Sequence, residues 1–239
     1  MTEFKRKIYQ NKRKKYVDDI NKSISFPFGP ICHAIFCAPT ESGKTQVIAN
    51  LIDKHGPYYK KFNKIFLVYP TYDDDDTIRV NFKFNSDEKD PECQVFRHYS
   101  DENLMRMVTY VDAKLVEYEG KYNTLIIFDD CQEYFTLGSA LSKFIVKARH
   151  KNIHCWISAQ RIKSITPTVR DQCKQFIIFP NSTKESLTAL SDLFNDPKEF
   201  LEKCELVRDF NRDMNDPYGL LFVNLKLPHI YYYNFTEEI

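Results

Sequence analysis

Eight consecutive residues form the chemically most informative segment of the chain, and they are Ala38, Pro39, Thr40, Glu41, Ser42, Gly43, Lys44 and Thr45. An apolar segment precedes them and a helix-forming segment follows, which is the strand, loop and helix order of a phosphate-binding loop. In such a loop the backbone N–H groups surround phosphates, the Lys44 ammonium reaches the β- and γ-phosphates, and the Thr45 hydroxyl ligates Mg²⁺. The segment therefore predicts a site for ATP and Mg²⁺.

Two residues of this loop depart from the usual pattern GxxxxGK[ST]. Ala38 stands where the first glycine is usual, so we expect the loop to curve there without the conformational freedom of glycine. Glu41 brings a negative charge close to the expected phosphates. Both departures bear on how tightly the loop binds nucleotide.

A second acidic motif complements the loop, because the apolar run Thr124–Phe128 ends in Asp129 and Asp130. We expect Asp129 to hold Mg²⁺ through Thr45 and water, and Asp130 to orient or deprotonate the attacking water. Glu133 is the alternative base and ranks behind Asp130.

A polar residue also follows the next apolar run, His154–Ser158, which ends in Ala159 and Gln160. At the carboxyl end of a strand beside the loop's own strand, a glutamine can touch the γ-phosphate or the attacking water. Gln160 is therefore predicted to sense hydrolysis.

The elements that must position these residues are predicted by apolar runs with helix-length segments between them, the pattern of a parallel α/β sheet. Several runs are apolar almost throughout, as expected for strands covered on both faces. The predicted strands are Ile31–Cys37, Lys64–Tyr69, Gln94–Arg97, Thr124–Phe128, His154–Ser158 and Gln175–Phe179, and the predicted helices are Lys44–His55, Asp101–Glu119, Leu137–Lys147, Thr183–Phe194 and Pro197–Cys204.

The C-terminal segment has a different pattern, in which the apolar runs 219–225 and 229–235 are separated by a short turn around Pro228. This pattern predicts a hairpin at about residues 218–236, added to the edge of the sheet. The whole sequence thus predicts an α/β fold, a RecA-like P-loop NTPase with a mostly parallel central sheet flanked by helices and a C-terminal β-hairpin.

The order of the motifs narrows the chemistry, because two predicted strands lie between the phosphate-binding loop and Asp129. We therefore expect another strand between the loop's strand and the carboxylate strand in the sheet. That arrangement indicates a motor-type ATPase rather than a small-molecule kinase or a GTPase, and the sequence contains no [NT]KxD guanine motif.

The composition of the chain limits the class of protein, and its charge distribution indicates how the chain is divided. The 239 residues are 43% hydrophobic and 28% charged, which excludes disordered and fibrous classes. Residues 1–16 carry seven Lys and Arg against one Glu, so we divide the chain into a basic N-terminal arm, 1–22, and one P-loop ATPase domain, 23–239. We expect no membrane segment, no secretion signal and no zinc site, and the seven cysteines are interpreted as reduced thiols.

Together these residues resemble the FtsK–HerA superfamily of ring-forming motors, and within it the DNA-packaging ATPases of poxviruses, other large DNA viruses and virophages. The resemblance covers roughly residues 30–180 and rests on residues 38–45, the two aspartates, residues 148–153 leading into Gln160, and residues 167–170 before a strand. It implies a ring, hexameric or pentameric, that hydrolyses ATP to move double-stranded DNA into a preformed capsid. The implied location is the host cytoplasm, at the virus factory, and the virion.

The resemblance also implies an arginine that completes the site of a neighbouring subunit. By position Arg149 ranks first and Arg170 second, with Lys174 a distant third. Residues 72–79 and 85–91 are candidates for loops that line the channel, and the basic arm could bind DNA or the capsid portal vertex.

Three alternative interpretations stay open. One is a helicase or DNA-transfer motor of the same superfamily. Another is a nucleotide-binding scaffold in which Ala38 and Glu41 have blunted catalysis. The third is a nucleotide or polynucleotide kinase, which should show a second substrate pocket.

Overall fold

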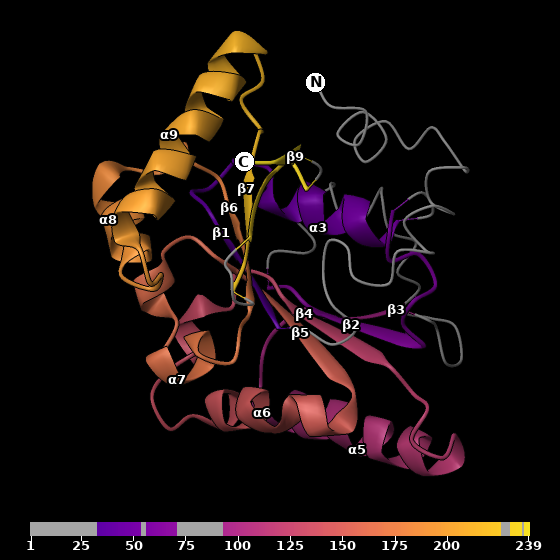
Figure 1. The fold of residues 1–239 in the computed structure, drawn as a ribbon. Helices are drawn as coiled ribbons and strands as arrows, with labels where there is room; N and C mark the ends of the chain where they lie inside the picture. The colour runs from indigo at the N-terminus through magenta and orange to yellow at the C-terminus, as the bar shows by residue number, and fades with distance from the viewer. Residues whose placement is uncertain (1–32, 54–55, 71–92, 226–229, 236) are drawn as a thin grey trace.

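The computed structural model describes residues 33–53, 56–70, 93–225, 230–235 and 237–239. They build one nine-stranded sheet in the order β3-β2-β4-β5-β1-β6-β7-β8-β9 (Figure 1). The mostly parallel sheet flanked by helices, which the sequence predicts, is confirmed.

Strands β1 to β6 pair in parallel. Parallel pairing requires a crossover connection between strands that follow each other in the sequence, either a helix or a long segment. Every expected strand is present; β4 has the predicted bounds, and the other five differ from the prediction by one to three residues at one end or both. The strands are β1 (Ala34–Cys37), β2 (Lys64–Val68), β3 (Cys93–Phe96), β4 (Thr124–Phe128), β5 (Ile153–Ala159) and β6 (Gln175–Ile178).

The position of β5 matters most for the site, because it pairs with β1 on one side and with β4 on the other. The predicted interposed strand between the phosphate-binding loop and the carboxylates is thus confirmed. We call the edge where β1, β4 and β5 end the carboxyl edge, and the edge where they begin the amino edge.

Three antiparallel strands extend the sheet beyond β6, namely β7 (Leu221–Asn224), β8 (Ile230–Tyr233) and β9 (Glu237–Glu238). The predicted C-terminal hairpin is therefore confirmed as β7 and β8. The prediction missed β9, since two glutamates give none of the apolar alternation by which strands are recognised.

The helices begin with α3 (Lys44–Ile52), α5 (Asp101–Glu117), α6 (Ala140–Ala148) and α7 (Pro167–Arg170), and α8 (Lys184–Ser191) and α9 (Pro197–Asp213) follow. All five predicted helices are present, each with at least one bound that differs from the prediction, and two of the differences have a clear local cause. Helix α6 begins at Ala140 rather than Leu137, because the Ser139 hydroxyl caps it by accepting from the Ser142 N–H. Helix α9 continues to Asp213 because its buried stripe of Phe200, Cys204, Val207 and Asn211 continues past residue 204.

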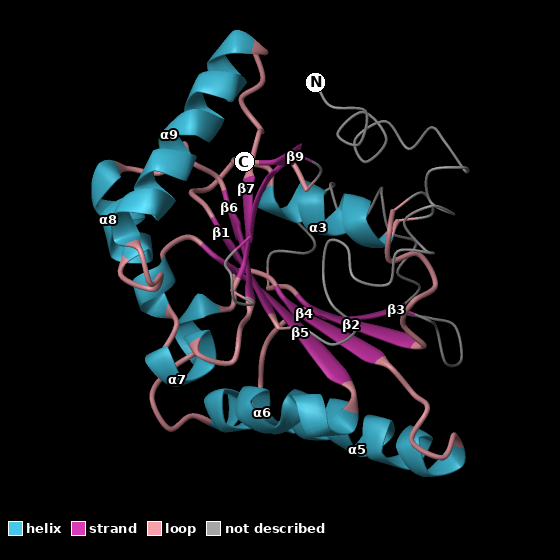
Figure 2. Cartoon of the chain, viewed as in Figure 1, coloured by secondary structure: helices cyan, strands magenta, loops and turns pink. Residues whose placement is uncertain are grey.

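The sheet separates two hydrophobic layers. Figures 1 and 2 show the helices that lie on its two faces. Along β1, Ala34 and Phe36 pack toward α3 with Val47 and Leu51, while Ile35 and Cys37 face the opposite layer. The opposite layer is covered by α5, α6, α7, α8 and α9 (Figure 2). Both faces being covered explains why the parallel strands are apolar throughout.

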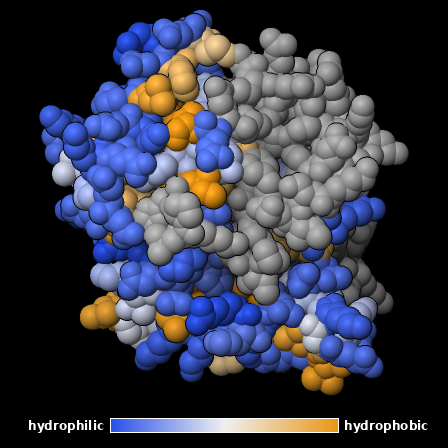
Figure 3. All heavy atoms as spheres, in the orientation of Figure 1, coloured by the Kyte–Doolittle hydropathy of each residue, from blue (hydrophilic) through white to orange (hydrophobic). Residues whose placement is uncertain are grey.

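The outer surface of these covering helices is largely hydrophilic, with hydrophobic atoms in small separate groups (Figure 3). Among the described residues, no helix combines the length and the hydrophobicity that crossing a bilayer requires.

Candidate nucleotide-binding site

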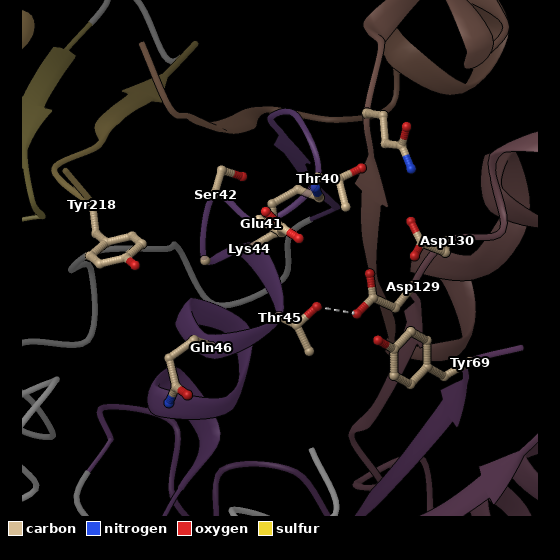
Figure 4. A pocket seen from close by; sticks show the side chains of 12 residues that line it. Thr40, Glu41, Ser42, Lys44, Thr45, Gln46, Tyr69, Asp129, Asp130 and Tyr218 are labelled. Carbon is tan, nitrogen blue, oxygen red and sulfur yellow. Dashed lines mark hydrogen bonds between the residues drawn. The ribbon is translucent and has the colours of Figure 1, made fainter. Parts of the chain in front are cut away.

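A cavity of about 530 Å³ opens at the carboxyl edge of the sheet, where the phosphate-binding loop and the acidic strand end meet (Figure 4). Most of the predicted site residues line it. Its lining residues are Thr40, Glu41, Ser42, Gly43, Lys44, Thr45, Gln46, Tyr69, Asp129, Asp130, Gln160 and Tyr218.

The loop curves through two residues with left-handed backbone, Glu41 with φ 62° and Gly43 with φ 87°. The loop curves without needing glycine at position 38: the Ala38 backbone is not left-handed, the residue is fully buried, and its N–H donates to the Ala159 carbonyl at 3.1 Å. The strain falls instead on Glu41, a residue type for which this conformation is unfavourable.

Gly43 also leaves the backbone N–H groups at the start of α3 available to bind an anion. It is the N-cap of the helix and has no side chain, so no side-chain cap occupies the first-turn amides. Backbone N–H groups at a helix N-terminus attract phosphate through their partial positive charge.

The Lys44 side chain is buried and folds back on the loop. Its ammonium donates to the carbonyl oxygens of Ala38 at 2.8 Å and Pro39 at 2.7 Å, which places the charge inside the curve of the loop. Burial lowers the pKa of Lys44, while the carboxylates of Asp129 and Asp130 act in the opposite direction. Phosphate oxygens can replace the two carbonyls as acceptors for this cation.

Thr45 and Asp129 are brought together as predicted, since the Thr45 hydroxyl donates to the Asp129 carboxylate at 2.9 Å (Figure 4). Asp129 is 1% exposed, and burial raises its pKa to about 6. The hydroxyls of Ser158 and Thr45 and the Lys44 ammonium oppose this rise. A buried carboxylate whose charge is incompletely compensated is a favourable ligand for a cation.

Asp130 and Gln160 both line the cavity, at the ends of β4 and β5. Asp130 has left-handed backbone with φ 51°, a conformation that aspartate tolerates better than most residues. The Gln160 N–H donates to the Gln132 side-chain carbonyl at 2.9 Å, which ties the two strand ends together. Glu133, the alternative base, is exposed on the turn 132–134 and does not line the cavity.

The three candidate trans cations lie away from this cavity. Arg149 is exposed on the turn that precedes β5, and Arg170 and Lys174 come shortly before β6. All three are therefore near the amino edge, opposite the chain's own phosphate-binding loop. Such residues can act on nucleotide only when another subunit presents it.

Four residues around the site were missed by sequence reasoning, namely Gln46, Tyr69, Gln132 and Tyr218. Tyr69 directly follows β2, the neighbour of β4, so the rule that strand ends meet at one edge could have identified it. Tyr218 comes from the loop between α9 and β7, and no local signal in the sequence relates it to a loop so distant along the chain.

Several predictions lie outside the described residues, namely the basic arm 1–22 and the channel candidates 72–79 and 85–91. Within the described residues, no three His, Cys, Asp or Glu side chains gather as a metal-binding group, and the six cysteines covered are free.

Solved structures with the same fold include viral packaging enzymes. The genome packaging NTPase B204 from Sulfolobus turreted icosahedral virus 2, in complex with ATP-gammaS, has a TM-score of 0.61 and 16% identity, covering 89% of this chain and 100% of that chain. The DNA-packaging ATPase B204 from Sulfolobus turreted icosahedral virus has a TM-score of 0.56 and 16% identity, covering 81% and 92%. The pCW3 conjugation coupling protein TcpA has a TM-score of 0.52 and 15% identity, covering 85% and 60%.

A family-level match covers most of the chain. Residues 32–216 match the family described as Poxvirus A32 protein. No curated protein sequence matches significantly.

Proposed function

Because the chain belongs to the poxvirus A32 protein family, we propose that it is a viral genome-packaging ATPase, which works as an oligomeric ring and moves double-stranded DNA into a capsid. The observation that carries the ATPase assignment is the contact between Thr45 and Asp129 in the cavity that also holds Lys44 and Asp130. Two solved proteins of the same fold are named as packaging enzymes, which supports the proposed use of the hydrolysis.

ATP binds with its phosphates in the curve of residues 38–45. The first-turn amides of α3 and the Lys44 ammonium receive the β- and γ-phosphates, and Lys44 exchanges its two carbonyl acceptors for phosphate oxygens. This exchange costs little, because the ammonium already lies inside the loop.

The residues present also fit Mg²⁺. Thr45 and Asp129 supply the oxygen donors that this hard cation prefers, and the buried Asp129 carboxylate gains a compensating charge. When bound, the ion neutralises charge on the phosphates. The raised pKa of Asp129 implies that its carboxylate must lose its proton before it can serve as a ligand.

The attacking water is positioned by Asp130 and Gln160. Asp130 accepts a proton from the water or orients it, and Gln160 reports on the γ-phosphate from the adjacent strand end. The bond between Gln160 and Gln132 links these two strand ends, so a change at one is transmitted to the other.

A neighbouring subunit of the ring supplies one further positive charge to the site. Arg149, or else Arg170, lies near the amino edge and reaches the nucleotide of a neighbouring subunit, where it stabilises charge on the transferred phosphoryl group. DNA is held by its phosphate backbone, since a packaging motor must pass any sequence. The basic arm binds DNA or the portal vertex, and the protein acts at the virus factory in the host cytoplasm.

Steady-state ATP hydrolysis at high protein concentration, with and without long double-stranded DNA, tests this function. We expect turnover that DNA stimulates, that Lys44→Ala abolishes and that Lys143→Ala, a change on the exposed surface of α6, preserves. Binding of ATP without turnover under both conditions would reject the motor and favour the scaffold alternative. Turnover with a small-molecule phosphate acceptor instead of water would favour the kinase.

A further inference from the structure

The nucleotide cavity has two chemically different ends on either side of the phosphate-binding loop (Figure 4). Asp129, Asp130 and Tyr69 lie at one end, and Tyr218 lies at the other, beyond Ser42. The first end carries the groups that act on water and the cation. The proposed function assigns no role to the second end.

Tyr218 is an exposed aromatic residue on a loop that is otherwise firmly held. Its own N–H donates to the Asp216 carboxylate at 3.0 Å, and the Asn181 side chain donates to the Pro217 carbonyl at 2.6 Å. The buried Asn211 side chain donates to the Gly219 carbonyl at 3.1 Å. These bonds fix the backbone on both sides of Tyr218, a residue that is 48% exposed.

The ring lies directly against the phosphate-binding loop. A Cβ added at Gly43 would be 3.4 Å from Tyr218 Cδ1, an ordinary van der Waals distance, so the ring lies beside this residue of the loop. An aromatic ring placed on a rigid loop, beside a phosphate cradle and within the same cavity, presents a flat surface to whatever extends from the phosphates.

The positions of the groups that act on the attacking water determine the orientation of the bound nucleotide. The γ-phosphate must face Asp130 and Gln160, because these residues position the attacking water. The α-phosphate and the nucleoside then extend in the opposite direction, past Ser42 and Gln46 toward Tyr218.

We propose that Tyr218 is the stacking platform for the base of the bound nucleoside triphosphate. This inference rests on the proposed function and adds the determinant of base preference. Stacking rewards a large π surface and does not depend on hydrogen-bond patterns, so the site favours purines over pyrimidines and distinguishes ATP from GTP only slightly.

Calorimetric titration of the full chain with ATP, GTP, CTP and inorganic tripolyphosphate tests the proposal. Tyr218→Ala should weaken ATP and GTP binding about 5- to 150-fold and leave tripolyphosphate within about twofold of wild type. Tyr218→Phe should bind like the wild type. Tyr118→Ala, a change of a similarly exposed tyrosine at the end of α5, is the matched control and should change nothing.

Two results would overturn the proposal while leaving the proposed function intact. One is unchanged ATP affinity in Tyr218→Ala. The other is an equal loss for ATP and tripolyphosphate, which would mean that the ring supports the phosphate loop rather than the base. A wild type that binds neither ligand would instead reject the proposed function, and this inference with it.

Discussion

The carboxyl and amino edges of the sheet both bury ionisable groups, and they treat them in opposite ways. At the carboxyl edge, Lys44 and Asp129 are buried next to each other, and left-handed backbone occurs at Glu41 and Asp130. At the amino edge, the buried His33 accepts a hydrogen bond from the Cys155 N–H at 3.0 Å, in an ordinary packed setting. Left-handed backbone is not confined to the carboxyl edge, since Asn152 has φ 51° directly before β5. The buried carboxylate with a raised pKa, Asp129, lies where the function is proposed, which is where perturbed ionisable groups are often found.

The two edges also titrate in opposite directions. Burial lowers the pKa of His33 and of His154 to about 4. Between about pH 6.5 and pH 4 the two imidazoles therefore stay neutral in the folded state, whereas they become protonated in the unfolded chain. The stability from these histidines is therefore lost as pH falls from about 6.5 to 4. Burial raises the pKa of Asp129 to about 6, so its contribution is lost as pH rises from about 4 to 6.

The largest expected effect concerns Arg149, which lies near the amino edge and is nevertheless proposed to act in catalysis. A loss of activity on its removal would show that catalytic residues are not confined to the carboxyl edge. Arg149→Ala should lower turnover by about 10³-fold or more, the range known for arginines that act in trans. Lys147→Ala, a change of an exposed cation two residues earlier, in the last turn of α6, should retain activity. Steady-state ATP hydrolysis with DNA checks both variants.

Mixing experiments show whether Arg149 acts between subunits. Arg149→Ala mixed with Asp130→Asn should recover part of the activity, since some interfaces then combine an intact Asp130 with an intact Arg149. Absence of recovery, or full activity of Arg149→Ala alone, would move the role to Arg170 or Lys174.

Asp130→Asn should lower turnover by about 10²- to 10⁴-fold and leave ATP binding in place, because it removes the base and not the phosphate contacts. Glu133→Gln is the matched control, and its turnover should stay within about twofold of wild type, since Glu133 does not line the cavity. The reverse pattern would assign the base to Glu133.

Asp129→Asn should separate stability from activity. The substitution removes a buried charge, so the free energy of unfolding at pH 7.5 without nucleotide or metal should rise, by up to about 3 kcal/mol. The gain should vanish near pH 4, where the wild-type carboxyl is already protonated in the folded state. Urea unfolding at several pH values measures it, and a loss of stability at pH 7.5 would contradict the account.

The smallest effect concerns Glu41. Glu41→Gly should stabilise the fold by about 1 kcal/mol by relieving left-handed backbone, and should raise ATP affinity by removing a negative charge. Glu41→Gln keeps the strain and removes the charge, so it should improve affinity without improving stability. Thermal unfolding and calorimetric titration distinguish the two contributions.

The sequence allowed the parallel sheet and the carboxyl edge to be predicted, because apolar strands, the phosphate-binding loop and the carboxylate pair leave local signatures. It did not predict Tyr218, which reaches the cavity only through the antiparallel extension of the sheet. It also gave no sign that Glu41 adopts the left-handed conformation, while Ala38 departs from the pattern at a position with ordinary backbone. Sequence motifs identify residues whose chemical type and spacing suit a known role. Backbone conformation and contacts between residues distant in the sequence depend on how the chain packs, so they are seen only in the structure.

The central claim, that hydrolysis drives movement along double-stranded DNA, is tested most directly by displacement of a triplex-forming oligonucleotide from a long duplex. The account predicts displacement by the wild type with ATP, none with a non-hydrolysable analogue, and none by Lys44→Ala. Hydrolysis that DNA stimulates but that displaces no oligonucleotide would contradict it.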